Sequence, residues 1–410
     1  YRIHSITIIG NETTKDYIIR QELSLHADSL LTYAELKYDL ERIYSLQLFT
    51  KVTAEAVPLE NNTADLIIMV HERWYFYPYP NLGLRDRSWN KIYYGLGVVH
   101  TNFSGKNVRV FGSFALGYDP YVSLNYYDPL IYLERQISLG ISGYYKKQRN
   151  RSLVSQAGST NFDENQLVAN VTVGKRFSLF SSAAVTLNFI RLTVSDNRAG
   201  RTLSPDGTDQ YFSLNFNTTY DTRDLREYPR IGSYFGIGIT KNGLFEKTIN
   251  YQSTGIDLRR YIPIYFDMTI AGRVFGAYKW GGRIPNYNHV YFGYGDRIRG
   301  YFYKILEGEQ QFGTTAEIHY PILKPRYVRM DVLPLEQFRD IRYAVNVALF
   351  ADAGAVWYRT QKFSINKMYS GYGAGIHFLL AYSAVVRFEY AFPYDRKSRG
   401  EFIFDVGAAL

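Results

Sequence analysis

The chain has 410 residues, no cysteine, 39 tyrosines, 26 phenylalanines, and 47 Lys and Arg against 38 Asp and Glu, a net charge of +9. With 46% hydrophobic residues it is too apolar for a disordered protein, and the lack of cysteine excludes disulfide scaffolds, thiol catalysis and cysteine-bound metals. A mean hydropathy of −0.24 and the lack of an apolar run near the roughly 18 residues that a spanning helix needs exclude a helical membrane protein. A β-barrel stays compatible, because a wall that alternates lipid-facing and lumen-facing residues is mildly hydrophilic on average.

The charges divide the chain into two parts. Residues 1–73 hold seven Lys and Arg against eleven Asp and Glu, a net charge of −4, and the remaining residues hold 40 against 27, a net charge of +13. The hydrophobic pattern changes at the same boundary, so we predict one domain over residues 1–73 and a second over residues 74–410. Tyr1 enters a predicted strand directly, without a signal-like segment, and we therefore expect a mature or trimmed chain.

The N-terminal domain is predicted to be a small α+β module. A capping-box pair, Thr32 and Glu35, opens a helix whose buried face has Leu36, Leu40 and Ile43 at helical spacing. The predicted elements are, in chain order, a strand over residues 3–9, a helix over residues 14–24, the helix from Thr32, and strands over residues 51–57 and 66–70. Many small domains place two helices on a three-stranded sheet, so this module alone defines no function.

From residue 74 onward helical spacing disappears, and apolar and polar residues alternate between clusters of Gly, Pro, Asn and Asp. The predicted strands span residues 74–85, 91–103, 106–118, 120–127, 134–146, 164–176, 181–195, 209–221, 231–242, 247–261, 264–280, 310–321, 340–357, 369–380, 383–392 and 400–410. An even count over roughly 330 residues without a helix favours a closed barrel over a soluble sandwich. We therefore predict an all-β transmembrane barrel of 16 antiparallel strands, preceded by one small α+β domain.

The alternation also predicts which residues face the lumen. In strand 310–321, Ile318 and Tyr320 share one face, whereas Glu317 and His319 share the other. In strand 340–357, Asp352 lies opposite an apolar face. Because the apolar face of a barrel strand meets lipid, Glu317 and Asp352 are both predicted to point into the lumen.

Residues 281–309, between the eleventh and twelfth strands, form the longest predicted loop. Its aromatic residues are Tyr287, Tyr291, Phe292, Tyr294, Tyr301, Phe302 and Tyr303. Burying that much aromatic surface is favourable, and the lumen is the nearest surface available, so we predict that the loop folds toward the lumen.

The loop contains the tetrapeptide Ile298, Arg299, Gly300 and Tyr301. It resembles the Val-Arg-Gly-Phe/Tyr signature of the BamA-like superfamily, whose members join periplasmic POTRA domains to a 16-stranded outer-membrane barrel of the bacterial surface antigen type. Further matches occur in the family's order: Asp221 to Asp224 with Pro229 and Gly232, Ala316 to Ile318, Phe350 to Gly354 with Trp357, Gly371 to Gly375, and Phe388 to Ala391. Residues 1–73 likewise resemble a POTRA domain. The resemblance implies a bacterial outer-membrane protein with its POTRA domain in the periplasm.

The resemblance also implies a site. In the family the loop arginine enters the barrel and pairs with wall carboxylates, which carries over here as Arg299 with Glu317 and Asp352. Removing one partner from such a buried pair would cost about 3–5 kcal/mol. In the alternative interpretation Arg299 lies on a solvated loop, and its ion pair contributes under about 1 kcal/mol.

A second predicted site is the seam where the barrel closes, by pairing of strand 74–85 with strand 400–410. Pro78 and Pro80 remove hydrogen-bond donors from the first strand, and Phe402 and Phe404 give the last strand an apolar outer face. A weak seam would open laterally and present strand edges to a substrate polypeptide.

The sequence has no recognisable signature of an enzyme or of a cofactor site. We expect no catalytic residues, no metal, no cofactor and no nucleic acid partner. His71, His319 and His377 are interpreted as ordinary strand residues, and Gly371 and Gly373 as positions that allow close approach of the loop.

These observations predict an outer-membrane protein assembly and insertion factor or a polypeptide translocator, acting by β-augmentation at the POTRA edge and at the seam. The expected partners are outer-membrane lipid and lipopolysaccharide, unfolded outer-membrane or secreted polypeptides, and periplasmic chaperones or accessory lipoproteins. Two alternatives stay open: a dedicated secretion pore for one partner or fused passenger, and a passive porin.

Overall fold

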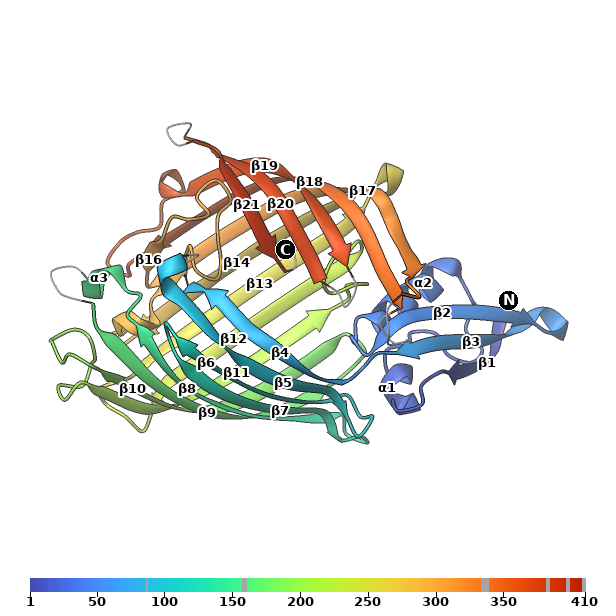
Figure 1. The fold of residues 1–410 in the computed structure, drawn as a ribbon, viewed down its shortest axis with the longest axis horizontal. Helices are drawn as coiled ribbons and strands as arrows, with labels where there is room; N and C mark the ends of the chain where they lie inside the picture. Colours follow the sequence, from blue (N-terminus) through green and yellow to red (C-terminus); the bar gives the residue numbers. More distant parts are fainter. Residues whose placement is uncertain (86–87, 157–160, 333–338, 381–383, 396–398, 408–410) are drawn as a thin grey trace.

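The computed structural model contains a three-stranded sheet near the N-terminus, a 16-stranded sheet in the rest of the chain, and a separate two-stranded hairpin (Figure 1). It describes residues 1–410 except 86–87, 157–160, 333–338, 381–383, 396–398 and 408–410. Residue 383 and residues 408–410, which belong to predicted strands, lie outside the described residues. Within the described chain no helix is long and apolar enough to cross a membrane.

The N-terminal domain has the predicted order of elements: β1 (Arg2–Ile9), α1 (Asp16–Arg20), α2 (Tyr33–Tyr44), β2 (Phe49–Pro58) and β3 (Thr63–Glu72). β3 is the central strand, parallel to β1 and antiparallel to β2. The backbone N–H of Glu35 donates to the Thr32 hydroxyl, which closes the predicted capping box at the start of α2. Helix α1 ends at Arg20, earlier than predicted, because the Asp39 carboxylate takes the N–H groups of Ser24 and Leu25.

The remaining chain forms one antiparallel sheet of 16 strands in sequence order. The strands are β4 (Phe76–Leu84), β5 (Ile92–Phe103), β6 (Val108–Gly117), β7 (Tyr121–Tyr132), β8 (Ile137–Arg149), β9 (Asp163–Arg176), β10 (Ser181–Val194), β11 (Thr208–Asp221), β12 (Gly232–Leu244), β13 (Tyr251–Pro263), β14 (Thr269–Gly281), β17 (Gln310–Arg329), β18 (Asp340–Trp357), β19 (Tyr369–Leu380), β20 (Ala384–Pro393) and β21 (Glu401–Val406). Short helices lie in the connections: η1 (Glu60–Asn62), η3 (Trp89–Lys91), α3 (Leu153–Gln156), η4 (Tyr265–Asp267), η5 (Asn286–Asn288) and η7 (Ile365–Lys367). The predicted fold class is confirmed.

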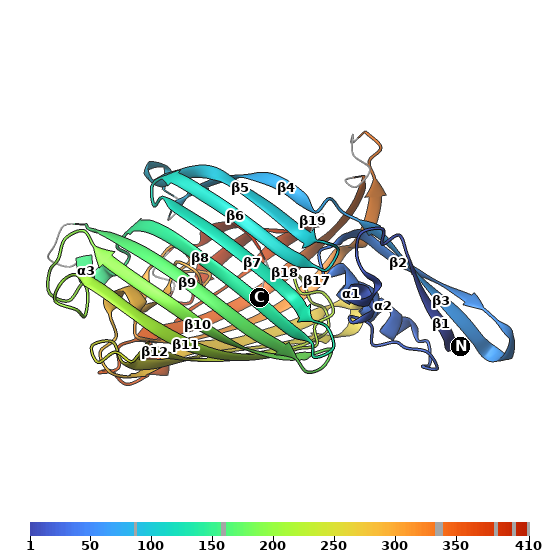
Figure 2. The same ribbon diagram turned by 90° about the horizontal axis from the view of Figure 1, so that it is seen from below.

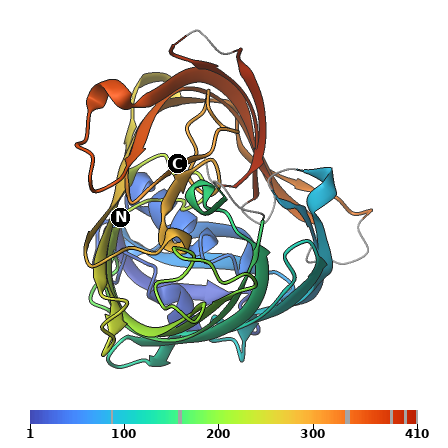
Figure 3. The same cartoon turned by 90° about the vertical axis from the view of Figure 1, so that its left-hand side faces the viewer.

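Side chains alternate along the strands as the sequence pattern predicts. In β17, Ile318 and Tyr320 are exposed on the outside, whereas Glu317 and His319 are buried inside. The same alternation exposes a broad apolar surface around the outer wall, which is the surface that a barrel presents to lipid. Figure 3 looks into the barrel from the end opposite the N-terminal domain.

The predicted closure of the barrel is wrong. β4 and β21 lie at the two ends of the sheet order, and no pairing between them occurs in the part of the chain that the structure describes. The physical reason lies in both strands: β21 has only six residues, and Pro78 and Pro80 deprive β4 of donors. The two end strands face each other without a ladder (Figure 1).

β17 continues to Arg329, well past the predicted end at residue 321. The extended ends of β17 and β18 project out of the barrel at the end that carries the N-terminal domain, as Figure 2 shows. Arg342 of β18 donates to both carboxylate oxygens of Glu41 in α2, at 2.8 and 2.7 Å. The Lys51 ammonium lies 5.9 Å from the ring centroid of Tyr327. The extension therefore holds the N-terminal domain at one end of the barrel.

Candidate functional site in the barrel lumen

The loop after β14 folds into the barrel, as Figure 3 shows. Its base is a short hairpin that the sequence analysis missed, β15 (Val290–Phe292) paired with β16 (Leu306–Gly308). Three-residue strands carry too little alternation to stand out in a sequence. Beyond the hairpin, Phe292, Ile298 and Tyr301 pack against Phe275 of β14 in one buried apolar cluster. This packing turns the tip of the loop toward the wall formed by β17 to β20.

Arg299, at the tip of the loop, is 5% exposed and contacts three wall carboxylates. Its Nε and Nη2 donate to the two oxygens of Asp352, each at 2.7 Å, and Nη1 donates to Glu389 Oε1 at 2.9 Å. Nη2 also lies 2.5 Å from Glu317 Oε1, an ionic contact without hydrogen-bond alignment. The guanidinium carbon sits 3.7 Å from the ring centroid of Phe350, so the cation is enclosed on its face as well as its edges.

The backbone around Arg299 explains two glycines of the pattern. Gly300 has φ +97°, and a Cβ there would lie 2.8 Å from the Phe392 carbonyl oxygen. At Gly371 of β19 a Cβ would lie 2.0 Å from the Arg299 carbonyl oxygen. Both positions therefore require glycine for the loop to reach the wall.

Two histidines and one carboxylate join the site without having been predicted for it. His319 Nε2 lies 2.5 Å from Glu317 Oε2, and His377 Nε2 lies 3.2 Å from Glu389 Oε1. Both histidines lie in strands, as predicted, and each is buried against a carboxylate that contacts Arg299. In the sequence, one feature pointed to Glu389. It alternates with Phe388 and Tyr390 in the segment from Phe388 to Ala391 that matches the family.

Carboxylates outnumber guanidinium groups in this cluster. The single Arg299 guanidinium faces three carboxylates, which leaves an excess of negative charge. A second guanidinium, that of Arg387, lies 3.7 Å from Glu389 and reduces this excess. In the described residues no group of His, Cys, Asp and Glu is arranged to hold a metal ion. The centre of the cluster is the Arg299 side chain itself.

A turn from the opposite end of the barrel reaches the same histidines. Tyr228, in the connection between β11 and β12, stacks on His319 with 4.9 Å between ring centroids. Its hydroxyl lies 3.0 Å from His377 Nδ1. Burial raises the pKa of the Tyr228 hydroxyl well above its usual value, so the hydroxyl keeps its proton for this contact.

The same turn contacts the N-terminal domain. Tyr38 of α2 donates to the Thr222 carbonyl at 3.0 Å, and Gln47 donates to Glu227 at 2.6 Å. Leu225 and Tyr228 belong to the buried apolar cluster that also contains the core of the N-terminal domain. Contacts thus run without interruption from α2 through this turn to the carboxylate cluster around Arg299.

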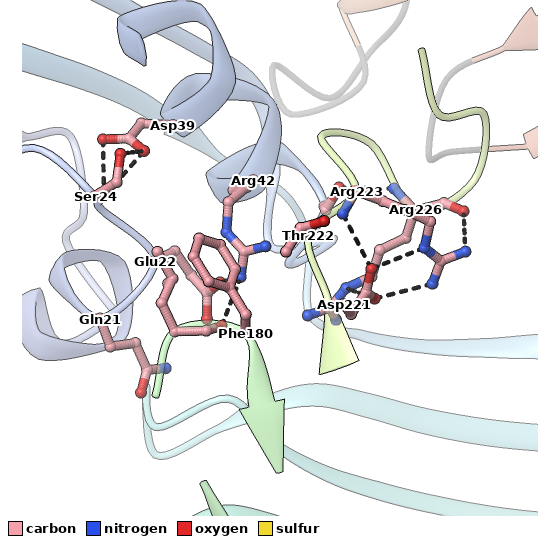
Figure 4. A network of polar contacts seen from close by, with 12 residues as sticks. Gln21, Glu22, Ser24, Asp39, Arg42, Phe180, Asp221, Thr222, Arg223 and Arg226 are labelled. Carbon is pink, nitrogen blue, oxygen red and sulfur yellow. Dashed lines mark hydrogen bonds and ion pairs between the residues drawn. The ribbon is translucent and has the colours of Figure 1, made fainter. Parts of the chain in front are cut away.

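A second set of contacts, shown in Figure 4, fixes α2 to the turn between β9 and β10. Glu22 forms an ion pair with Arg42 of the same domain at 2.8 Å (Figure 4). It is buried between Arg42 and Arg176 of β9, which also lies 2.8 Å away. Arg42 also donates to the Leu179 carbonyl at 3.2 Å and lies 5.4 Å from the ring of Phe180. The N-terminal domain is therefore locked onto the barrel by buried charges as well as by apolar contact.

On the far side of the loop, Glu307 of β16 binds a neighbouring connection. It accepts hydrogen bonds from the Ser152 hydroxyl and the Leu153 N–H, both at 2.6 Å, and lies 2.6 Å from His289 Nδ1. Burial acts to raise the pKa of Glu307, but the hydrogen bonds from His289 and Ser152 outweigh it and lower the pKa. The lumenal loop is thus anchored at both of its ends.

The predicted seam residues lie on the free edges of the sheet. The Tyr75 carbonyl accepts from the Thr101 N–H in β5, so odd-numbered residues of β4 direct their backbone groups toward β5. Pro78 and Pro80 consequently direct theirs toward the free edge, where they supply carbonyls but no N–H. The first strand therefore has an edge with missing donors.

The backbone hydrogen bonds also show which residues of β21 face its free edge. The Gly407 N–H donates to the Val385 carbonyl, so the backbone groups of Phe402 and Phe404 point away from β20. The lumenal loop reaches this edge, because the Tyr303 hydroxyl donates to the Phe402 carbonyl at 3.3 Å. The seam and the loop motif are therefore parts of one connected structure.

A barrel of 16 antiparallel strands, preceded by a β-α-α-β-β domain and holding an Arg-Gly-Tyr loop against its inner wall, defines a POTRA-bearing outer-membrane barrel protein. The chain belongs to the Omp85 superfamily: residues 102–409 match the Omp85 superfamily domain, and residues 1–73 match the POTRA family described as surface antigen variable number repeat. The resemblance found in the sequence is confirmed.

Solved structures share this fold. The crystal structure of BamA from Haemophilus ducreyi lacking POTRA domains 1–3 superposes with a TM-score of 0.59 at 18% identity, over 99% of this chain and 84% of that one. CdiB from Escherichia coli gives 0.56 at 10% identity, over 99% and 76%. CdiB from Acinetobacter baumannii gives 0.51 at 14% identity, over 99% and 74%. At these identities the likeness shows the fold alone.

Proposed function

We propose that this protein inserts or translocates polypeptides at the bacterial outer membrane, using the unpaired ends of its barrel sheet as templates for a substrate strand. Membership of the Omp85 superfamily supports the coarser role of insertion or translocation. The observation that supports the mechanism is the sheet order, in which β4 and β21 each have one neighbouring strand in the described chain.

The free edge of β4 has hydrogen-bond acceptors without the full set of donors. β4 presents carbonyl acceptors at Pro78 and Pro80 without the matching donors, so a strand that pairs there gains only part of a ladder. Such an edge binds a strand weakly and releases it again. A complete edge would instead pair with β21 and close the barrel.

The lumenal loop gives the seam its position. Arg299 holds the loop against β18 and β20, and the N–H of Phe302, the residue directly after the motif, donates to Glu401 of β21 at 2.8 Å. We infer that the loop keeps β21 drawn toward the lumen, and that its release would let β21 move toward β4. In this proposal the Arg-Gly-Tyr motif controls the seam without contacting substrate.

The POTRA sheet supplies a further edge. β2 is a terminal strand of the sheet order β1-β3-β2, and its residues 55–58 are exposed. A polypeptide arriving from the periplasm would add to this edge by β-augmentation before it reaches the seam. Periplasmic chaperones or accessory lipoproteins would deliver it, and lipid with lipopolysaccharide would surround the apolar outer wall.

A crosslink across the seam tests the proposal. The chain has no cysteine, so cysteines can be placed at Leu82 of β4 and Phe402 of β21, both exposed, and joined by a bismaleimide long enough to span the unpaired seam. Joining them is expected to abolish insertion or secretion. The control joins Leu96 of β5 to Phe114 of β6, which are paired already. Full activity of the Leu82–Phe402 crosslinked protein would rule out the seam mechanism.

Depletion of the protein separates insertion from dedicated secretion. A general loss of outer-membrane proteins would support an insertion factor, whereas the loss of a single secreted polypeptide would support a dedicated secretion pore. A passive porin would show neither loss, and its steady conductance would survive removal of the 282–309 loop.

A further inference from the structure

A cavity of about 700 Å³ lies inside the barrel, near the ends of β4 to β8 that are remote from the N-terminal domain. The wall residues around it are Leu84, Arg85, Tyr93, Asp119, Tyr121, Ser123, Tyr144, Lys146 and Arg151, and the lumenal loop adds Tyr294, Gly295 and Arg297. Its position places it beside the end strand β4 and next to the loop that bears Arg299.

The lining of this cavity has an excess of positive charge. Four cationic side chains face a single carboxylate in the described lining, that of Asp119. Asp119 is already engaged, because it forms an ion pair with Arg85 and accepts the Arg149 N–H at 2.9 Å. The charges of Lys146 and Arg151 are therefore left without a carboxylate in the described lining.

Two of these cations have unused hydrogen-bonding capacity. The Lys146 ammonium has no hydrogen-bond or ion-pair partner in the described part of the chain, and Arg151 Nε is buried without an acceptor. The Arg151 guanidinium instead lies over the ring of Tyr294, 4.9 Å from its centroid. Cations held together in a confined lumen repel one another and concentrate the opposite charge between them.

We propose that this cavity binds the carboxylate side chains of an acidic segment of a polypeptide in the lumen. Lysine and arginine bind carboxylates through short charge-assisted hydrogen bonds, and the tyrosine rings give apolar surface for an extended chain. The volume is far larger than one small anion needs, since a water molecule occupies about 30 Å³ of liquid. The inference rests on the proposed function, because it assigns a substrate chemistry to the same lumen.

The cavity also connects to the loop motif. Tyr294 and Arg297 precede Arg299 in the loop, the Arg297 Nε donates to the Tyr294 carbonyl at 3.1 Å, and the Arg297 guanidinium lies over Phe302, 4.3 Å from its ring centroid. A segment bound in the cavity at Arg151 would therefore lie against the part of the loop that leads to β21.

Peptide binding to the full-length protein in detergent micelles tests the proposal. The probe is a fluorescently labelled glutamate-rich peptide, compared with a peptide of the same length that has glutamine in place of glutamate. The wild-type protein is expected to bind only the glutamate peptide, more weakly as salt is added. Lys146→Gln with Arg151→Gln is expected to weaken binding by about tenfold or more.

The matched control is Lys247→Gln with Lys362→Gln, which removes the same charge from exposed connections at the same end of the barrel. It is expected to bind as the wild type does. Heat-modifiable migration in gels verifies that each variant is folded. Equal binding of both peptides, or unchanged binding by the Lys146 and Arg151 variant, would overturn the proposal. Full competition by inorganic phosphate at equal charge would also overturn it, in favour of a small-anion site.

The outcome is separate from that of the proposed function, because peptide binding needs no insertion or secretion. If the seam crosslink stops activity and the glutamate peptide does not bind, the cavity proposal alone fails. If the peptide binds and the crosslinked seam stays active, the seam mechanism alone fails.

Discussion

Replacing Arg299 with alanine is expected to lower the free energy of unfolding by about 3–5 kcal/mol, the cost of leaving buried charges without their partner. Arg299 donates three side-chain hydrogen bonds, two at 2.7 Å to Asp352 and one at 2.9 Å to Glu389. Each bond to a charged group contributes about 1.5–3 kcal/mol, so the three together contribute about 4.5–9 kcal/mol, mostly above that range. The cost of burying the guanidinium, which alanine avoids, offsets the difference.

Arg299→Lys is expected to cost about 1–3 kcal/mol. Lysine retains the charge but loses the planar fork that binds both oxygens of Asp352 and still reaches Glu389. The control is Arg359→Ala, because Arg359 pairs with Glu309 on a partly exposed connection and its loss should cost under about 1 kcal/mol.

The measurement is urea unfolding of the purified protein in detergent micelles, followed by tryptophan fluorescence and heat-modifiable migration. A double-mutant cycle of Arg299→Ala with Asp352→Asn isolates the pair, and the two losses should be strongly non-additive. A loss for Arg299→Ala no larger than that for Arg359→Ala would refute the buried anchor and favour a solvated loop.

Gly300→Ala should destabilise the barrel by about 1–3 kcal/mol in the same assay, because alanine is strained at φ +97° and its Cβ would press on the Phe392 carbonyl. Arg342→Ala should loosen the POTRA domain, detected as faster proteolysis between the domains, because it removes two bonds to Glu41. Glu307 has a lowered pKa in the folded protein, so its stabilising effect is present above the unfolded value of about 4.3 and is lost as the pH falls through the folded value. The protection factor of the Leu153 amide, which is the intrinsic exchange rate divided by the observed rate at the same pH, should therefore fall in acid, and Glu307→Gln should remove that pH dependence.

Each of these three predictions has an internal control. Gly295→Ala should be nearly silent, since a Cβ there meets nothing within 4 Å. Arg20→Ala removes an exposed pair with Asp16 and should leave proteolysis between the domains unchanged. If Gly300→Ala destabilises the barrel no more than Gly295→Ala does, the close contact at Gly300 does not require glycine. If Arg342→Ala is cut between the domains no faster than Arg20→Ala, the bonds from Arg342 to Glu41 do not hold the domain. If the protection of the Leu153 amide falls in acid by the same factor in Glu307→Gln, the pH effect does not come from Glu307.

Only part of the seam could be predicted from the sequence. The sequence predicts that the two prolines of β4 leave the strand without two hydrogen-bond donors, because proline lacks a backbone N–H in any conformation. Which edge they faced, and whether β4 and β21 paired at all, depended on register against β5 and β20. Register is a property of neighbouring strands, and the sequence of one strand does not contain it.

The sequence by itself determined the two domains, nearly all strand positions and the lumen-facing side of Glu317 and Asp352, because alternation with a period of two is a local property of each strand. Only the tertiary structure decided that Glu389 would be a third partner of Arg299, 90 residues further along the chain. It also decided that Tyr228 would meet His377 from the opposite end of the barrel. Alternation tells which face a residue occupies, but the path of a loop and the closure of a wall decide which residues meet across the lumen.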